Sequence, residues 1–198
     1  MYILGFDPGG LNRFGWASLR ADKAGRPLAL KTGLCSGASV AVCQAGRAAK
    51  LLPIAIGIDA PLFWVANGDR QSDSHVRKLV CAAGGSSGTV GHVNSLRGAC
   101  LVQGVLTACR VKESWPTAAI TEAHPKALLR VHPRAHEFLR VHLPHPNSEH
   151  ERDAALAAYA ALALVLCFAG WQNLMLKESA PFFPGGHEVS YWFPCEST

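Results

Sequence analysis

The chain has 198 residues, of which 49% are hydrophobic and only 17% are charged. This composition is typical of one well-buried globular domain; it excludes an intrinsically disordered chain, and the length is too short for two ordinary domains. The 19 Lys and Arg residues outnumber the 14 Asp and Glu residues, giving a formal net charge of +5. This surplus is compatible with an anionic partner such as nucleic acid, although a solvated basic face is its commoner cause.

The first half of the chain alternates short apolar runs with turn residues and one Ala-rich segment. Residues 38–52 predict a helix that ends before Pro53, and residues 54–58 form a continuous apolar run typical of a buried central strand. Three earlier runs predict an antiparallel meander of strands, namely residues 1–6, 14–19 and 28–34.

The second half begins with a segment around residues 66–94 that ends in Gly- and Ser-rich sequence, which predicts a broken helix and a mobile loop inserted into the domain. A helix is expected over residues 95–110, a strand over 118–121 and a short helix from Pro125. We therefore expect a single α/β domain over residues 1–198.

The last long helix is predicted to begin at Ser148, with Glu151 completing a capping box. Residues 154–171 carry no charge and are long enough for a membrane span, but they are rich in alanine and lack basic flanks, so we expect a buried helix and no membrane partner.

Seven cysteines at irregular spacings include no C-x-x-C pair, and no apolar signal segment is recognisable, which predicts a cytoplasmic location. A cysteine nucleophile at Cys81 or Cys100 is an alternative, but no neighbouring residue in the sequence marks an activated thiol.

Four carboxylates occupy positions that point to a common site. Asp7, Asp59 and Glu122 each stand at or just past the end of a predicted strand, and Asp153 lies near the start of the last helix. Because strand ends meet at one edge of a sheet, these side chains are expected to converge there. Each also has a simpler role available: Asx-turns for Asp7 and Asp59, a structural contact for Glu122, and a helix-dipole contact for Asp153.

Converging carboxylates repel one another unless a cation neutralises them, and oxygen ligands favour Mg²⁺ or Mn²⁺. Two such ions about 4 Å apart support an in-line phosphoryl displacement. Arg77, Arg97 and Lys126 are the candidate contacts to substrate phosphates, and a solvated surface is equally consistent with all three.

Both ends of the chain resemble RNase-H-like nucleases and Holliday-junction resolvases of the RuvC type. The opening resemblance is carried by residues 3–10 (ILGFDPGG) and 14–17 (FGWA). The closing resemblance is carried by residues 150–157 (HERDAALA), in which a metal-binding aspartate is preceded, three residues earlier, by a second polar ligand. His150 occupies that earlier position, where some resolvases carry an acidic residue, and a histidine there admits Mn²⁺ or other transition metals more readily.

The chain also resembles a family of predicted nucleases with an RNase H fold. The matching motifs are Ile58-Asp59-Ala60-Pro61-Leu62, Arg70 with Asp73, Thr121-Glu122 before His124-Pro125, Asp153-Ala154, and residues 188–194. The resemblance implies an RNase-H-like, five-stranded mixed sheet flanked by helices. It also implies a metal-dependent phosphodiesterase acting on DNA or RNA. In that site Asp7 bridges two ions, Asp59 and Asp153 hold one each, and Glu122 or His150 completes the coordination.

Two other functions remain open at this point. One is a small nucleotide-binding phosphotransferase of the actin and sugar-kinase superfamily, whose opening strand and turn are similar but whose second domain has no room in 198 residues. The other is a non-catalytic nucleic-acid-binding module that has kept the fold. The resemblance to dimeric junction resolvases also allows a homodimer.

Overall fold

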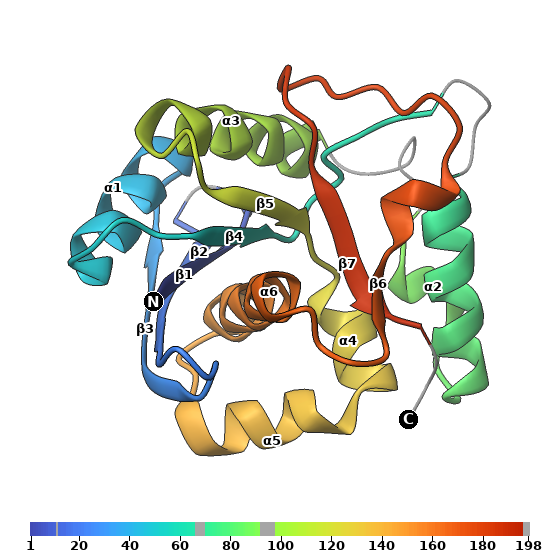
Figure 1. Ribbon diagram of the computed structural model, residues 1–198, viewed down its shortest axis with the longest axis horizontal. Coiled ribbons are helices and arrows are strands. Elements are labelled where there is room, and N and C mark those ends of the chain that lie inside the picture. The colour runs from blue at the N-terminus through green and yellow to red at the C-terminus, as the bar shows by residue number, and fades with distance from the viewer. Residues whose placement is uncertain (11, 66–69, 92–97, 196–198) are drawn as a thin grey trace.

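The structure is a computed structural model that describes residues 1–10, 12–65, 70–91 and 98–195 (Figure 1). Its helices and strands follow one another along the chain as β1 (Tyr2–Asp7), β2 (Phe14–Ala21), β3 (Pro27–Cys35), α1 (Ala38–Ala49), β4 (Ala55–Ile58), α2 (Gln71–Ala82), η1 (Ser87–Thr89), α3 (Gly98–Ser114), β5 (Ala119–Glu122), α4 (Pro125–Val131), α5 (Pro133–His142), α6 (Glu149–Leu166), β6 (Trp171–Asn173), η3 (Leu174–Lys177) and β7 (Ser190–Pro194). This arrangement confirms the predicted α/β class with a mixed sheet.

Within the described residues, the strands form one seven-stranded sheet in the order β3-β2-β1-β4-β5-β7-β6. Strands β1, β2 and β3 are antiparallel as predicted, whereas β4, β5 and β7 run parallel to β1. The predicted count of five strands is wrong, because β6 and β7 extend the sheet beyond β5. Strand β6 has only three residues, too few for a clear alternating pattern in the sequence. The five residues of β7 belong to the family motif of residues 188–194 and were not predicted as a strand.

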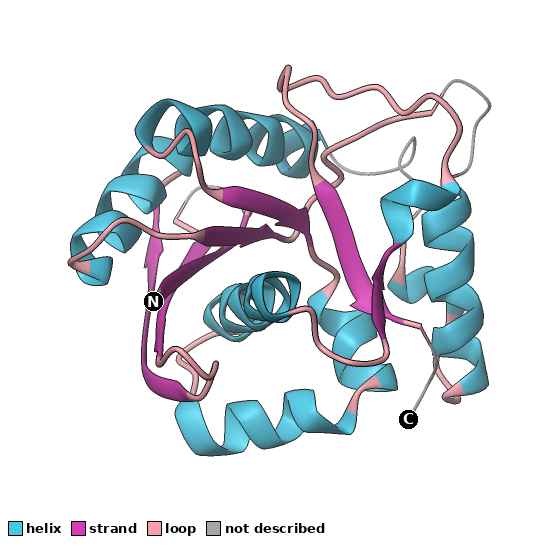
Figure 2. Cartoon of the chain, in the orientation of Figure 1, coloured by secondary structure: helices cyan, strands magenta, loops and turns pink. Residues whose placement is uncertain are grey.

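Helices cover both faces of the sheet (Figures 1 and 2). Helices α1 and α3 lie together on one face, and α6 packs on the other face against β1, β2 and β4. Helices α4 and α5 flank α6. Residues 153–163 of α6 are all buried, as the Ala-rich sequence predicts, and no described helix is long and apolar enough to span a membrane.

Two glycines allow α6 to lie unusually close to the sheet. A Cβ atom on Gly5 of β1 would overlap the carbonyl oxygen of Ala154, and one on Gly57 of β4 would overlap the carbonyl oxygen of Ala157. Any side chain at these two positions would push the helix away. The close approach therefore fixes the start of α6, which carries His150 and Asp153, over the ends of β1 and β4.

The predicted cap of α6 at Ser148 is present, but the Glu151 side chain binds Asn147 and does not complete the capping box. The Ser148 hydroxyl accepts a hydrogen bond from the Glu151 backbone N–H (3.1 Å). The Glu151 carboxylate turns to Asn147 instead of Ser148 and accepts from the Asn147 backbone N–H (3.0 Å). Both contacts hold the first turn of the helix in place.

The segment expected to be a mobile insertion contains helix α2 and the short 3-10 helix η1 among its described residues, 70–91. Residues 66–69 and 92–94, together with the predicted cap at Ser95, lie outside the described residues. Helix α2 packs against α4 and η3 beside the added strands β6 and β7.

Candidate metal centre

Three of the four predicted carboxylates lie at the same edge of the sheet. Asp7 is the last residue of β1, Glu122 is the last residue of β5, and Asp59 directly follows β4. The strand register pairs Ile58 with Phe6 on one side and with Glu122 on the other, which aligns the three strand ends. Asp153 reaches this edge from α6.

Asp7 is buried and held by His150. The Nδ1 atom of His150 donates a hydrogen bond to Oδ2 of Asp7 (2.7 Å), which leaves Oδ1 without a partner in the described part of the chain. Burial raises the pKa of Asp7 to about 6 even though His150 opposes the rise, and the negative charge of Asp153 adds to it. His150 therefore orients Asp7 and compensates only part of its charge.

Asp59 has no hydrogen bond or ion pair to its carboxylate within the described residues. Burial raises its pKa well above the usual range, and the negative charges of Asp7 and Asp153 raise it further. The neighbouring Cys100 thiol donates a weak hydrogen bond to the Asp59 carbonyl (4.0 Å). Burial and the nearby carboxylates raise the pKa of Cys100 to about 12, so this thiol stays protonated and is not an activated nucleophile.

Asp153 is buried beside Arg152. Both Nε and Nη2 of Arg152 donate to the same oxygen, Oδ1 of Asp153, at 2.8 and 2.7 Å. Burial still raises the pKa of Asp153 above its usual value. Oxygens on all three aspartates therefore remain without a described partner: Oδ1 of Asp7, both oxygens of Asp59, and Oδ2 of Asp153. Four carboxylate oxygens are the kind of donor that Mg²⁺ and Mn²⁺ prefer.

The ligand atoms of the three aspartates do not form one compact group. These atoms do not all lie within 4.8 Å of one another; among the described residues, only Asp73, Glu122 and His124 form a group that close. Two ions about 4 Å apart, with one carboxylate shared between them, span a wider set of ligands than one ion does. The charges of Asp7 and Asp153 both act on Asp59, and the charge of Asp153 acts on Asp7, so the three carboxylates form one electrostatic group.

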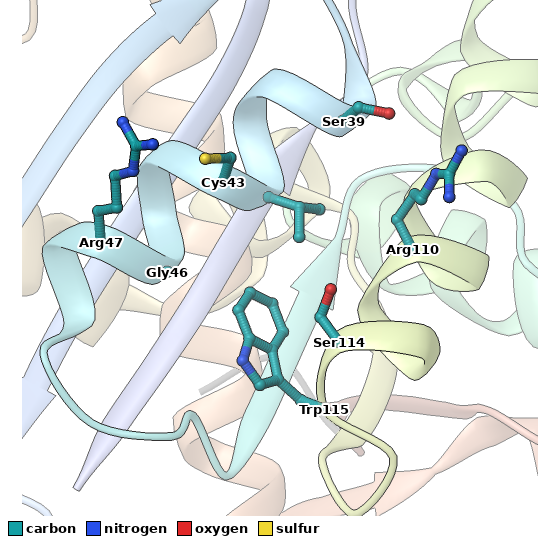
Figure 3. A pocket seen from close by; sticks show the side chains of 8 residues that line it. Ser39, Cys43, Gly46, Arg47, Arg110, Ser114 and Trp115 are labelled. Atoms are coloured by element: carbon teal, nitrogen blue, oxygen red, sulfur yellow. The ribbon is translucent and has the colours of Figure 1, made fainter.

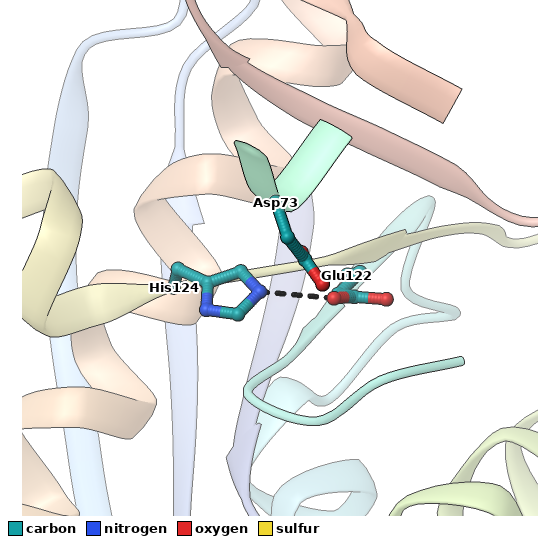
Figure 4. Close-up of side chains that lie close together, drawn as sticks. All are labelled: Asp73, Glu122 and His124. Carbon is teal, nitrogen blue, oxygen red and sulfur yellow. Dashed lines mark hydrogen bonds and ion pairs between the residues drawn. The ribbon is translucent and has the colours of Figure 1, made fainter. Parts of the chain in front are cut away.

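The fourth predicted carboxylate, Glu122, is already paired with Arg70. Nη2 of Arg70 donates to Oε1 (2.6 Å) and Nη1 to Oε2 (2.9 Å), while His124 contacts Oε1 through Nε2 (2.9 Å) (Figure 4). Burial alone would raise the pKa of Glu122, but the Arg70 guanidinium and the His124 hydrogen bond lower it to about 2. Asp73 binds the same guanidinium at 2.7 and 2.8 Å. A metal ion at this group would meet a fixed positive charge, so the group does not fit a cation.

The Arg70 ion pair instead holds the chain that follows Asp59. The Leu62 backbone N–H donates to Oε2 of Glu122 (2.9 Å), and Nη1 of Arg70 donates to the Phe63 carbonyl (3.2 Å). Arg70 also stacks over the Phe63 ring, with 4.5 Å between its Cζ atom and the ring centroid. The family resemblance included Arg70 and Asp73 without a role; the structure places them in this buried network.

Of the three predicted phosphate contacts, one lies beside the aspartates. The ammonium of Lys126 on α4 partly offsets the raised pKa values of Asp7, Asp59 and Asp153, and it forms an ion pair with Glu149 (3.5 Å). Arg77 lies on α2, and its Nη1 donates to the Val90 carbonyl (3.5 Å). Arg97 lies outside the described residues.

Two surface cavities lie on opposite faces of the sheet. One, of about 480 Å³, lies between α4 and the start of α6 and is lined by Lys126, Leu129, Arg130, His136, Glu149 and Arg152. The other, of about 400 Å³, lies between α1 and α3, with Arg47 and Arg110 on either side (Figure 3). None of the four predicted carboxylates lines either of these two cavities, but the predicted phosphate contact Lys126 lines the first.

Comparison of the chain with protein-family models, with curated proteins and with solved structures finds no match.

Proposed function

We propose that the protein is a divalent-metal-dependent phosphodiesterase that hydrolyses DNA or RNA at the edge where Asp7, Asp59 and Asp153 meet. The observation that carries the proposal is that the described residues compensate the negative charge of these aspartates only in part. All three have raised pKa values, and Asp59 has no partner in the described part of the chain, whereas the neighbouring Glu122 is paired with Arg70 and has a lowered pKa. Uncompensated buried carboxylates destabilise a fold, and a bound cation removes that penalty.

The arrangement of the strands supports an RNase-H-like fold. Within the seven-stranded sheet, the first three strands are antiparallel and β4 and β5 run parallel to β1, an order that is compatible with such a fold. Fold alone does not specify activity, so the proposal depends on the site.

Each residue of the site has a distinct role in this proposal. Asp7, Asp59 and Asp153 would hold the Mg²⁺ or Mn²⁺ ions, with Asp7 shared between two of them as the resemblance implies, and His150 keeps Oδ1 of Asp7 directed to the site by holding Oδ2. Bound ions would activate a water molecule and stabilise the leaving oxygen of the phosphodiester. Arg152 holds one oxygen of Asp153 and leaves the other free.

Glu122 has a positioning role and is not a ligand in this proposal. Together with Arg70 it holds the backbone of residues 62 and 63, three and four positions after Asp59. The segment between β4 and that anchor is short, so the anchor limits how far Asp59 can move. Such support is what keeps a metal site in its productive geometry.

The test is a cleavage assay with labelled single-stranded, duplex, hybrid and branched DNA and RNA, with Mg²⁺, Mn²⁺ or a chelator. We expect cleavage that needs the metal, is abolished in Asp59→Asn and is retained in Asp22→Asn, a matched change at the exposed turn between β2 and β3. Failure of every substrate to be cut, or equal cleavage by Asp59→Asn, would contradict the proposal. Binding without cleavage in the presence of Mg²⁺ and of Mn²⁺ would favour the non-catalytic module.

A further inference from the structure

The cavity between α4 and α6 brings together basic side chains from three helices. Lys126 and Arg130 lie on the same face of α4 because they are four residues apart, and His136 comes from α5. The first turns of α6 contribute Glu149 and Arg152. We refer to this feature as the α4–α6 cavity.

Positive charge exceeds negative charge among the residues that line the α4–α6 cavity. Lys126, Arg130 and Arg152 face a single carboxylate, Glu149, which forms an ion pair with Lys126 (3.5 Å). Arg130 is exposed and has no hydrogen bond or ion pair within the described residues. Its guanidinium is therefore free to make the paired hydrogen bonds that this group forms with phosphate oxygens.

The α4–α6 cavity is joined directly to the candidate metal centre. Arg152 lines the cavity and donates two hydrogen bonds to Asp153 (2.7 and 2.8 Å). Lys126 also lines the cavity, and its charge partly offsets the raised pKa values of Asp7, Asp59 and Asp153. A group seated in the cavity would thus lie next to the carboxylates, on the side of α4.

We propose that the α4–α6 cavity binds a phosphate group of the nucleic-acid strand whose neighbouring phosphodiester lies at Asp7, Asp59 and Asp153. This inference rests on the proposed function for the identity of the ligand. Arg130 is the main phosphate contact, and Lys126 adds a second positive charge. Arg152, anchored by Asp153, fixes the distance between the bound phosphate and the metal centre.

The phosphate could belong to either of two parts of a strand. A terminal phosphate monoester carries up to two negative charges and fits the surplus of positive charge, whereas an internal phosphodiester carries one. A preference for a terminal phosphate monoester would make the protein act near strand ends. A preference for an internal phosphodiester would make it act within strands.

Binding of fluorescently labelled oligonucleotides in the presence of a chelator tests the inference without cleavage. Strands with and without a terminal phosphate are titrated against the wild type, Arg130→Gln, and Arg47→Gln as a matched loss of one positive charge beside the α1–α3 cavity. We expect Arg130→Gln to weaken binding about tenfold, the size expected for hydrogen bonds to a charged group. It should also reduce the dependence of log affinity on log salt by about 0.7 to 0.9 for the lost phosphate contact. Arg47→Gln should stay within about twofold of the wild type.

A loss in Arg130→Gln confined to strands with a terminal phosphate assigns the cavity to a phosphate monoester, and an equal loss for both strands assigns it to an internal phosphodiester. The inference is overturned if Arg130→Gln behaves like Arg47→Gln, or if the wild type binds neither strand. Thermal unfolding of both variants, each altered at an exposed arginine, checks that they are folded.

The assay also separates the cavity from the proposed reaction. Because it uses no metal, loss of binding in Arg130→Gln would support the cavity even if no cleavage occurred. Metal-dependent cleavage with unchanged oligonucleotide binding by Arg130→Gln would support the nuclease and refute the cavity.

Discussion

Replacing Asp7 by asparagine is expected to stabilise the metal-free protein while removing the proposed bridging ligand. Asparagine has nearly the size of aspartate and can still accept the His150 hydrogen bond, so the change removes mainly the negative charge. A stabilising substitution at a buried polar residue is unusual, because most single substitutions destabilise a fold. It is expected here because His150 compensates only part of the negative charge of Asp7.

The size of the effect follows from the raised pKa of Asp7. Its rise from the usual 3.8 to about 6 means that ionising Asp7 disfavours the folded state by about 3 kcal/mol. The folded state holds the proton more tightly than the unfolded state does. Stability is therefore lost as the pH rises from about 4 to about 6, and the full penalty is present at higher pH. For a domain of this length, about 3 kcal/mol corresponds to a shift in Tm of about 6–12 °C.

Thermal and urea denaturation in a chelator, at about pH 8 and again at about pH 4, measure this difference. Asp7→Asn should be the more stable protein at the higher pH, and the advantage should shrink at the lower pH. Saturating Mn²⁺ should stabilise the wild type and leave Asp7→Asn nearly unchanged. A variant that is less stable than the wild type at about pH 8 in a chelator would refute the reasoning, because the charge of Asp7 would then be compensated within the fold.

Three further predictions concern the same edge of the sheet. Glu122→Gln should lower the free energy of unfolding by about 1–3 kcal/mol in urea denaturation, because Arg70 loses one of its two buried carboxylate partners and keeps Asp73; a stabilised variant would contradict the assigned ion pair. Gly57→Ala should fail to fold or lose about 3 kcal/mol or more, because the added methyl group overlaps the backbone of α6. Gly10→Ala, where no atom lies within 4 Å of the added group, should unfold like the wild type, and equal stability of the two variants would be inconsistent with the close packing. Mn²⁺ affinity measured by calorimetry should fall at least about fourfold between about pH 7.5 and about pH 5.5, since the proton competes at Asp7 and the raised pKa values of Asp59 and Asp153 add to the competition; an affinity that rises toward acid pH would exclude Asp7 as a ligand.

Local sequence signals were sufficient for the features that depend on a single element. The apolar runs predicted strands β1 to β5, and the turn residues after them placed Asp7, Asp59 and Glu122 near strand ends. The Ala-rich run and its serine cap predicted α6 as a buried helix. These signals are local because the periodicity of a strand or helix depends only on the order of residues within that element.

Features made by distant residues were not predicted. Glu122 stands at the end of a strand, as Asp7 and Asp59 do, yet its carboxylate is paired with Arg70. These two residues are 52 positions apart in the sequence and meet only in the folded structure. The α4–α6 cavity likewise depends on how three helices pack. Strand β6 was missed because it has only three residues, and β7 was missed although its aromatic residues were a signal that could have identified it.

The most direct test of the account is calorimetric titration of the chelator-treated protein with Mn²⁺, for the wild type, Asp59→Asn and the matched Asp22→Asn. The account predicts that the wild type and Asp22→Asn bind two ions, and that Asp59→Asn, which removes a carboxylate with no described partner, loses at least one of them. Absence of binding to the wild type at millimolar Mn²⁺, or identical binding by Asp59→Asn, would contradict the assignment of this edge of the sheet as a metal centre.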